Sequence, residues 1–446
     1  MTIQFGSSGI RGKYPEDVGP DTAFELGRLL PRSLGSNLAV GRDPRRSGIV
    51  LRAAFIATAL ESGANIADYG MIPTPALAYE TKATDRSGGV MITASHNPPE
   101  YNGFKIFDSN GESLEDGSTT TSASSKKFQT LANGYGEKSE KTFPDHYWKR
   151  LSELRFRKKW SVMLDPGNGA ASLLAPKIYS HLLDRVSAIN SYPDGSFPGR
   201  GSEPTSDSMN MLSGVVVQMH ADAGLGFDGD ADRVYIVDEK GNRPLQDRVL
   251  ASYISFMARE SKGPYLVPVD ASMVVDEIAD RYGAKIIRGP VGDAKLLAQM
   301  KKAHAFFAGE PSGAWINGKI HNCPDGILSG LLYLKELDQF GLTVSESLKE
   351  IPEYVMIRKS IPYKGPVRQQ RLNSLVRPLA KIIGKNAKAT TKFGVRISSE
   401  ESWVLVRESG TEPVIRATIE SKNRKKAGQI MKDTIDLVRR IFKGSR

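Results

Sequence analysis

Three aspartates at alternate positions, Asp228, Asp230 and Asp232, are the strongest chemical signal in this sequence. On an extended backbone, alternate residues point to the same side of the chain. Three carboxylates gathered in this way repel one another strongly unless a cation lies between them. Because oxygen ligands select hard ions, the pattern predicts a site for Mg²⁺ or Ca²⁺.

Two other interpretations of this acidic stretch compete with the metal site. An EF-hand loop needs glycine at its sixth position, where this chain has Arg233, and residues 234–237 are typical of a strand rather than a helix. A solvated acidic turn stays open as an alternative. The glycines of residues 224–229 match a dinucleotide-binding pattern, but that pattern requires a helix immediately afterwards, so we reject it.

Ser95 lies in a second candidate site, the loop of residues 93–99 with the sequence Thr-Ala-Ser-His-Asn-Pro-Pro. The apolar run at 89–92 predicts a buried strand before it, and the prolines favour a fixed loop over a helix. A serine hydroxyl presented rigidly at a strand end suits a nucleophile or a phosphoryl carrier. Taken alone, a structural serine in a proline-rich turn is the commoner explanation. We expect His96 to orient the loop rather than act as a base, because side chains of adjacent residues tend to diverge.

Glu310 and Ser312 belong to a Gly-Glu-Pro-Ser-Gly stretch that follows the apolar residues 305–308. A carboxylate and a hydroxyl at a strand end can accept and donate hydrogen bonds to sugar hydroxyls. An ordinary Pro-Ser turn is the favoured explanation when the stretch is considered alone.

The stretch at residues 407–413, Arg-Glu-Ser-Gly-Thr-Glu-Pro, has the composition of a phosphate cradle. It combines two hydroxyls, an accessible glycine amide and two flanking guanidinium groups, from Ser409, Thr411, Gly410, Arg407 and Arg416. A Ser-Gly turn between two strands is the alternative. Near the N-terminus, the Gly/Ser-rich residues 5–12 with Arg11 suggest an anion-facing loop, or else a flexible terminus.

The elements that position these stretches predict an α/β protein of several domains. A chain of 446 residues is too long for one compact core and predicts roughly three or four domains. Strands and helices alternate through the first three parts, which indicates βαβ units. The last part differs, with a helix at 369–383, strands at 402–406 and 414–419 and a terminal helix, which indicates an α+β domain. The predicted domains are residues 1–150, 151–246, 247–364 and 365–446.

The composition is that of a soluble globular protein, with 39% apolar and 25% charged residues. No signal peptide or membrane-spanning run is visible, and Cys323 is the only cysteine, so we expect a cytoplasmic protein without disulfides. The net charge of +11 suits anionic small molecules. No nucleic-acid-binding motif accompanies the basic C-terminal helix, which we interpret as a solvated face, so neither nucleic acid nor membrane is an expected partner.

Taken together and in this order, the motifs resemble those of the α-D-phosphohexomutase superfamily. The matching stretches span the whole chain and are residues 9–12, 93–98, 102–105, 228–233, 309–313 and 407–413. The resemblance implies four domains around a central cleft, to which each domain contributes one motif. It also implies monomers or homodimers that act on small hexose phosphates.

The same resemblance assigns a role to each candidate residue. Ser95 would carry the phosphoryl group, and the three aspartates with phospho-Ser95 would bind Mg²⁺. Arg11, Lys105 and Arg233 would assist phosphoryl transfer, and Glu310 and Ser312 would contact sugar hydroxyls. The non-reacting phosphate would be held by Arg407, Ser409, Gly410 and Thr411, next to the Arg416 of the cradle described above. The implied reaction moves a phosphoryl group between the 1- and 6-positions of a hexose through a hexose 1,6-bisphosphate.

The identity of the hexose stays open between glucosamine, glucose and mannose, with glucosamine phosphate our best choice. Glu408 stands where relatives often have proline, and a carboxylate there weakens anion binding unless it points away. A Mg²⁺-dependent sugar-phosphate phosphatase and a non-catalytic sugar-phosphate sensor are the alternative functions.

Overall fold

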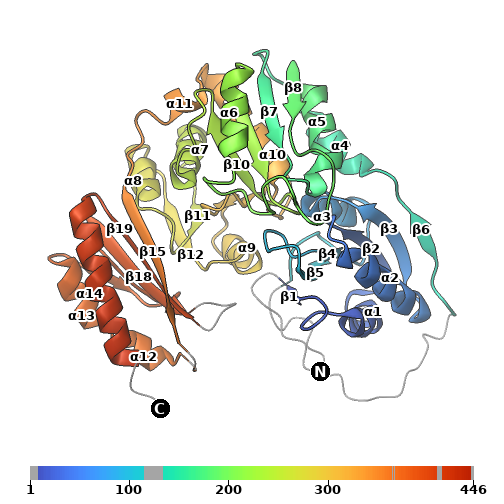
Figure 1. The fold of residues 1–446 in the computed structure, drawn as a ribbon, viewed down its shortest axis with the longest axis horizontal. Coiled ribbons are helices and arrows are strands. Elements are labelled where there is room, and N and C mark those ends of the chain that lie inside the picture. The colour runs from blue at the N-terminus through green and yellow to red at the C-terminus, as the bar shows by residue number, and fades with distance from the viewer. Residues whose placement is uncertain (1–8, 115–133, 364, 366, 409–413, 443–446) are drawn as a thin grey trace.

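The protein is described here by a computed structural model covering residues 9–114, 134–363, 365, 367–408 and 414–442. Its four domains form an arch, with the first domain (blue) and the fourth (red) at the two ends (Figure 1). None of the helices in these ranges is long and apolar enough to cross a bilayer.

The first domain is a six-stranded mixed sheet in the order β1-β5-β4-β2-β3-β6. Apolar strands β2 and β4 run parallel at its centre and are almost completely buried, as expected for a sheet covered by helices on both faces. The strands are β1 (Ile10–Lys13), β2 (Asn37–Arg42), β3 (Asn65–Met71), β4 (Gly88–Ile92), β5 (Tyr101–Asp108) and β6 (Lys138–Glu140). The helices are α1 (Pro20–Leu34), α2 (Ser47–Glu61), α3 (Thr74–Ala83) and α4 (Asp145–Leu151).

The second and third domains each have a four-stranded mixed sheet, in the orders β10-β9-β7-β8 and β12-β11-β13-β14. The second comprises β7 (Ser161–Asp165), η1 (Ala170–Leu173), α5 (Ala175–Leu182), β8 (Arg185–Ala188), α6 (Asn210–Gln218), β9 (Ala223–Phe227) and β10 (Val234–Asp238). The third comprises α7 (Gln246–Glu260), β11 (Tyr265–Pro268), α8 (Val274–Arg281), β12 (Ile286–Gly289), α9 (Asp293–Lys302), β13 (Phe307–Gly309), β14 (Trp315–Asn317), α10 (Gly326–Phe340) and α11 (Val344–Ser347).

The fourth domain is a five-stranded antiparallel sheet, β15-β19-β18-β17-β16, packed against helices. It comprises β15 (Val355–Pro362), α12 (Gln369–Asn373), α13 (Val376–Ile383), β16 (Lys388–Thr390), β17 (Val395–Ser398), β18 (Ser402–Glu408), β19 (Val414–Ser421) and α14 (Arg424–Phe442). The sequence assigned β15 to the third domain, but all eight of its residues pair with β19 in the fourth sheet.

The single helix expected at 369–383 is two helices, α12 and α13. Pro378 lacks an amide donor, and the restart at Val376 places it in the first turn of α13, where no intrahelical donor is needed.

One apolar core runs continuously through the first three domains, from Ile72 through Trp160 and Phe227 to Ile327. The fourth domain has a core of its own. Within the described residues, the apolar contact between it and the third domain is a small cluster centred on Val269, Trp403 and Leu405. The first three domains are therefore packed as one body, with the fourth attached at its side.

Candidate active site

Ser95 follows β4 in a loop that holds its backbone in an unusual conformation. Its φ of 50° lies in the left-handed region, which is costly for a residue with a side chain. Its amide donates to Thr93 Oγ1 at 2.8 Å, and its hydroxyl donates to Asp228 Oδ2 at 2.7 Å. The hydroxyl of the first domain thus faces the acidic loop of the second.

A fully buried ion pair between Arg45 and Asp43 supports this loop, and the sequence analysis did not assign either residue a role. The Arg45 guanidinium donates to the carbonyl oxygens of Ser95 at 2.9 Å and Asn97 at 2.6 Å. Thr93 Oγ1 donates to Asp43 Oδ2 at 2.7 Å. In the sequence, these two residues stand out only as part of a charged turn after β2. That strand pairs with β4, which leads into the Ser95 loop.

The acidic loop brings the carboxylates of Asp228, Asp230 and Asp232 together, with one oxygen of each within 4.8 Å of the others. They converge on a tight turn between β9 and β10, in which Ala231 has a φ of 66°, and not on the extended backbone we assumed. Gly229 is required here, because a Cβ at this position would lie 2.5 Å from the Ser95 carbonyl oxygen.

The donor set of this loop fits a divalent cation bound by oxygen ligands. Asp230 Oδ1 and Asp232 Oδ1 are buried and have no hydrogen-bond partner in the described structure. Burial, and then repulsion from Asp232 and Asp230, raises the pKa of Asp228 well above its usual range. Burial also opposes ionisation of Asp230, but Lys105 and a hydrogen bond from Thr74 hold its pKa below the usual value. A hard cation would relieve this repulsion and use the two unpaired oxygens.

Lys105 on β5 is the lysine that contacts these carboxylates. Its side chain is buried, with Nζ 3.0 Å from Asp230 Oδ2 and in contact with Asp232 Oδ2. Burial lowers the pKa of Lys105, but Asp230 and Asp232 outweigh this effect and raise it. Arg11 on β1 lies opposite Gly103, two residues from Lys105 on the same face of the sheet. Burial lowers the pKa of Arg11, whose guanidinium donates to Asn97 Oδ1 at 2.8 Å.

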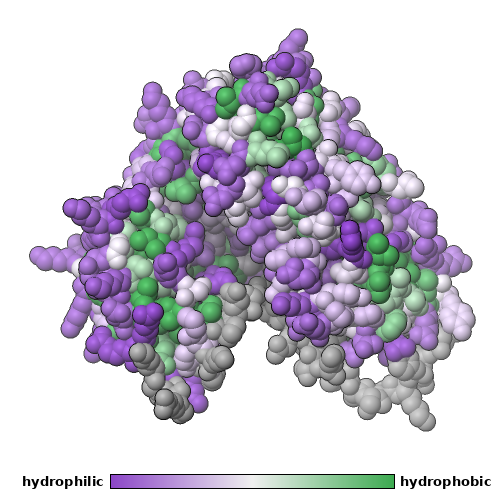
Figure 2. Space-filling model, in the orientation of Figure 1, coloured by the Kyte–Doolittle hydropathy of each residue, from purple (hydrophilic) through white to green (hydrophobic). Residues whose placement is uncertain are grey.

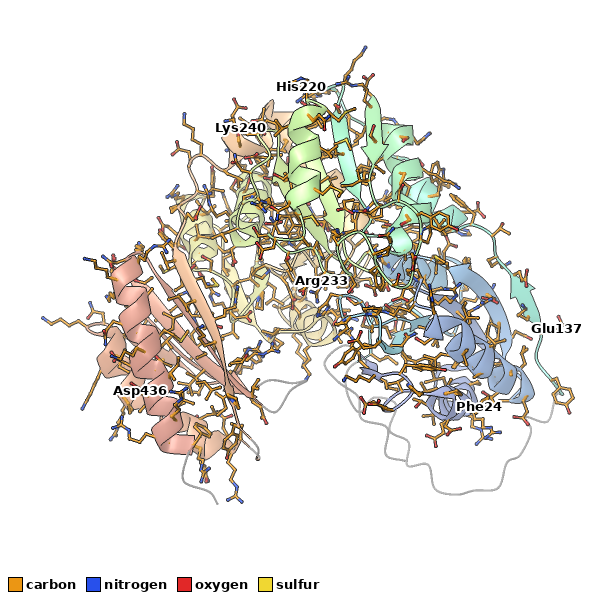
Figure 3. The ribbon with its side chains drawn as sticks, viewed as in Figure 1. Phe24, Glu137, His220, Arg233, Lys240 and Asp436 are labelled. Atoms are coloured by element: carbon orange, nitrogen blue, oxygen red, sulfur yellow. The ribbon has the colours of Figure 1, made fainter. Side chains whose placement is uncertain are left out.

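Arg233 adds a third cation beside the acidic loop. It lies at the inner side of the arch (Figure 3), with Nε 3.8 Å from Asp232 Oδ1 and Nη1 3.6 Å from Glu203 Oε1. Burial opposes its charge, but Asp232 and Asp228 raise the pKa of Arg233. Its guanidinium therefore stays charged at the cleft wall.

His96 lies closer to the serine than we expected. Its Nδ1 is 3.3 Å from Ser95 Oγ, because the left-handed φ of Ser95 turns the two side chains toward each other. Burial, and then Arg233 and Arg11, lower the pKa of His96 to about 2, so the ring is neutral. Ser202 of the second domain donates to the His96 carbonyl oxygen at 2.8 Å and fixes this part of the loop.

Glu310 and Ser312 lie in the loop that joins β13 and β14. Glu310 Oε1 accepts from the Gly292 amide at 2.9 Å, and Ser312 Oγ donates to Glu310 Oε2 at 3.1 Å. Trp315 Nε1 donates to the Glu310 carbonyl oxygen at 3.2 Å. Burial raises the pKa of the Glu310 carboxyl. The loop thus presents a fixed pair of polar side chains.

Arg407 and Arg416 lie directly opposite each other on β18 and β19. Like charges at such a position repel unless an anion is close. Arg407 Nη2 lies 3.4 Å from Asp270 Oδ2 of the third domain. Ser409, Gly410 and Thr411, which the sequence assigned to the same phosphate cradle, lie outside the described residues.

A cleft of about 810 Å³ brings these groups together, and Figure 2 shows the surface hollowed between the lobes of the arch. Asp228 and Asp230 lie behind its wall. The predicted site residues that line it are Ser95, Lys105, Arg11, Asp232, Arg233, Glu310, Ser312, Arg407 and Arg416. All four domains contribute, and the size is typical of a small-molecule site.

Family models of four successive domains match this chain in order. They are the phosphoglucomutase/phosphomannomutase alpha/beta/alpha domains I, II and III, at residues 2–127, 142–241 and 246–354, and the C-terminal domain at 367–437. A relative from Pyrococcus abyssi named probable phosphoglucosamine mutase is 35% identical over 450 residues, covering 99% of each chain.

Solved structures show the same fold. A phosphoglucomutase/phosphomannomutase family protein from Burkholderia thailandensis has a TM-score of 0.86 at 23% identity, covering 100% of this chain and 98% of that chain. An N-acetylphosphoglucosamine mutase from Aspergillus fumigatus, solved with GlcNAc-6P and magnesium, has a TM-score of 0.64 at 16% identity, covering 99% and 96%. The four-domain α/β fold is thereby confirmed. The chain belongs to the phosphoglucomutase/phosphomannomutase family, in the α-D-phosphohexomutase superfamily that its motifs predicted.

Proposed function

We propose that this protein is a phosphohexomutase, an isomerase that moves a phosphoryl group between the 1- and 6-positions of a hexose phosphate. The observation that carries the proposal is the cleft. A serine hydroxyl bonded to an acidic loop, the loop of Glu310 and Ser312, and a pair of opposed arginines come from different domains and share it. Phosphoryl transfer depends mainly on positioning and charge neutralisation, and this cleft supplies both.

In the first half-reaction, phospho-Ser95 gives its phosphoryl group to the free hydroxyl of the sugar. The bond between phosphorus and Ser95 Oγ breaks, a bond to the sugar oxygen forms, and the hydroxyl proton ends on Ser95 Oγ. Lys105 is a buried ammonium group beside the acidic loop. We assign it the relay, in which it gives a proton to Ser95 Oγ and takes up the proton of the sugar hydroxyl. The hexose 1,6-bisphosphate then turns over, and Ser95 takes back the other phosphoryl group.

The cations around Ser95 neutralise charge on the transferring group. Asp228, Asp230 and Asp232 would hold Mg²⁺, which, when bound, offsets negative charge on the phosphoryl oxygens. Arg11 and Arg233 lie at the same wall of the cleft and add two fixed positive groups. At the other side, Glu310 and Ser312 would accept and donate hydrogen bonds to the sugar hydroxyls. Arg407 and Arg416, with Ser409, Gly410 and Thr411, would hold the phosphate that is not reacting.

Glucosamine phosphate is the substrate we assign, because the Pyrococcus abyssi relative is named for that activity. The direct test is a coupled assay of the purified protein with the 1- and 6-phosphates of glucosamine, glucose and mannose. We expect interconversion, fastest for the glucosamine phosphates. Net release of phosphate without isomerisation would instead identify a phosphatase. Failure of Ser95 to take up phosphate would identify a sensor.

A further inference from the structure

A second cavity of about 160 Å³ lies in the third domain, between α7, α10 and the β13–β14 hairpin. Tyr253, Met257 and Glu260 line it from one face of α7, because residues spaced by three and four lie side by side on a helix. Leu332 and Glu336 face it from α10 in the same way. An apolar cavity of about 150 Å³ is large enough for benzene, so this one has room for a small ring compound.

Asn317 gives this cavity an unused hydrogen-bond donor. Its side chain lines the cavity and is only 8% exposed. Tyr253 donates its hydroxyl to Asn317 Oδ1 at 3.2 Å, but the buried Nδ2 has no partner within the described residues. Buried polar groups are normally hydrogen-bonded, so this amide offers a donor to an acceptor from outside the chain, either a water or a ligand.

Two carboxylates, of Glu260 on α7 and Glu336 on α10, line the cavity together with Lys319. Glu260 is exposed and Glu336 is half-buried, and burial, followed by repulsion from Glu260, raises the pKa of Glu336. Among the described residues, Glu336 makes no hydrogen bond or ion pair. Glu260 accepts one hydrogen bond there, from Gln339 Nε2 at 3.2 Å. The aromatic wall is completed by Phe306, whose ring lies 4.4 Å from Lys319 Nζ.

We propose that this cavity binds a small aromatic or aliphatic amine that also carries an oxygen acceptor. The apolar body would lie against Tyr253 and Phe306, and the ammonium group would pair with Glu336 and Glu260. The oxygen would accept from Asn317 Nδ2. The ammonium group would therefore meet carboxylates that have no ion pair among the described residues. The oxygen would meet an amide that has no acceptor there.

The site is joined to the cleft through the β13–β14 hairpin, which has Asn317 at its base and the Glu310–Ser312 loop at its tip. Tyr253 stacks on Trp315 with ring centroids 5.0 Å apart, and Trp315 donates to the Glu310 carbonyl oxygen. A ligand that repositions Tyr253 and Asn317 therefore acts on the sugar loop, and it changes the KM for the hexose phosphate. This coupling rests on the proposed function, whereas binding of the amine does not.

Calorimetric titration of the full-length protein with tyramine tests the site. Compounds of this size bind with a Kd on the order of 0.1–1 mM. 4-Ethylphenol lacks the ammonium group and phenethylamine lacks the hydroxyl, and each should bind at least about 10-fold more weakly than tyramine. Glu336→Gln should reduce the preference for tyramine over 4-ethylphenol, because Glu260 alone then pairs with the ammonium group, while the exposed control Glu25→Gln should keep the full preference.

The donor is tested by Asn317→Leu, which should abolish the preference for tyramine over phenethylamine. If that variant does not fold, the comparison of the two ligands on the wild-type protein tests the same donor. No binding of tyramine, equal binding of the three compounds, or unchanged binding in Glu336→Gln would overturn the site, whatever the mutase assay shows. Normal binding with an unchanged KM for hexose phosphate would overturn the coupling alone.

Discussion

The two sides of the cleft are built in opposite ways. At the serine side, Ser95, Lys105 and the acidic loop are buried and contact one another across two domains. At the side proposed to anchor the phosphate, Arg407 is partly exposed, and among the described residues it contacts Asp270 of the third domain at 3.4 Å. The groups around Ser95 are thus preorganised. The position of Arg407 in the cleft, in contrast, depends on the orientation of the fourth domain.

The junctions between the domains follow the same division. The first three domains share one apolar core. The fourth is attached by a small apolar cluster and by polar contacts around Glu420, which accepts from the Met273 amide at 2.8 Å and from Ser272 Oγ at 2.5 Å. This difference shows that the groups around Ser95 belong to a body with a shared apolar core, whereas Arg407 is positioned through a much smaller junction.

The largest effect should come from Ser95→Ala, which removes the proposed phosphoryl carrier. We expect turnover to fall at least about 1,000-fold, because Ser95 is the hydroxyl that both bonds to the acidic loop and lines the cleft. Intact-mass measurement after incubation with hexose 1,6-bisphosphate should show a phosphoryl adduct on the wild type and on the control Ser312→Ala. The same adduct on Ser95→Ala would show that the assignment is wrong.

Next is Asp230→Asn, which removes one charge from the proposed Mg²⁺ site. Turnover should fall about 100-fold or more, since the cation contributes several kcal/mol to charge neutralisation. Chelation should abolish the wild-type activity, and added Mg²⁺ should restore it. Full activity of this variant in chelator would contradict a metal at the serine side.

At the anchor side, Arg407→Ala should raise KM for both the 1- and the 6-phosphate, because the two ends of the sugar use this site in turn. A lost charge-assisted hydrogen bond corresponds to about 1.5–3 kcal/mol, or roughly 10- to 150-fold. The intermediate should also escape more often, so the variant should depend more on added hexose 1,6-bisphosphate.

Two controls sharpen this comparison of the two sides. Lys105→Ala should lose kcat that added bisphosphate does not restore, and Arg424→Ala on the exposed face of α14 should behave as wild type. If Arg407→Ala has a normal KM and no added dependence on the bisphosphate, Arg407 does not hold the non-reacting phosphate.

Glu310→Ala should have a smaller effect, confined to recognition of the sugar. Loss of a hydrogen bond to a hydroxyl lowers kcat/KM by about 1–3 kcal/mol, or roughly 5- to 150-fold. Steady-state kinetics across the hexose phosphates measures this loss. An unchanged kcat/KM for every one of them would exclude Glu310 as a sugar contact.

The smallest expected effect concerns stability at the junction of the fourth domain. Burial raises the pKa of Asp247 to about 6, and its carboxylate accepts from the Ser272 amide at 2.7 Å. Between about pH 4 and pH 6 the folded protein therefore holds a proton that the unfolded chain has released. This contribution lowers the free energy of unfolding as the pH rises through that window.

Asp247→Asn should remove this contribution. The change in Tm between about pH 4 and pH 6 should then differ from that of the wild type by about 2–4 °C. Thermal unfolding of the two proteins at several pH values measures the change. Parallel curves for wild type and variant would show that Asp247 does not titrate in this range.

Local sequence determined much of the fold and the order of the site motifs. The buried strand expected at 89–92 is β4, and those expected at 402–406 and 414–419 are β18 and β19. These predictions rest on apolar runs bounded by Gly, Pro and Ser, which act over a few residues. The predictions that failed depend on distant partners. The domain to which β15 belongs is one example, because it is set by pairing with β19, a strand about 60 residues later.

The sequence by itself determined that this chain has four motifs, around Ser95, Asp228, Glu310 and Arg407, because each is a continuous stretch. Only the tertiary structure decided how they meet. Ser95 bonds to Asp228 across 133 positions, and the buried Arg45 holds the serine loop across 50. The three carboxylates converge through a turn, and Arg407 opposes Arg416 through strand register. Such contacts depend on packing between separate strands and domains, which local patterns of residue type do not encode.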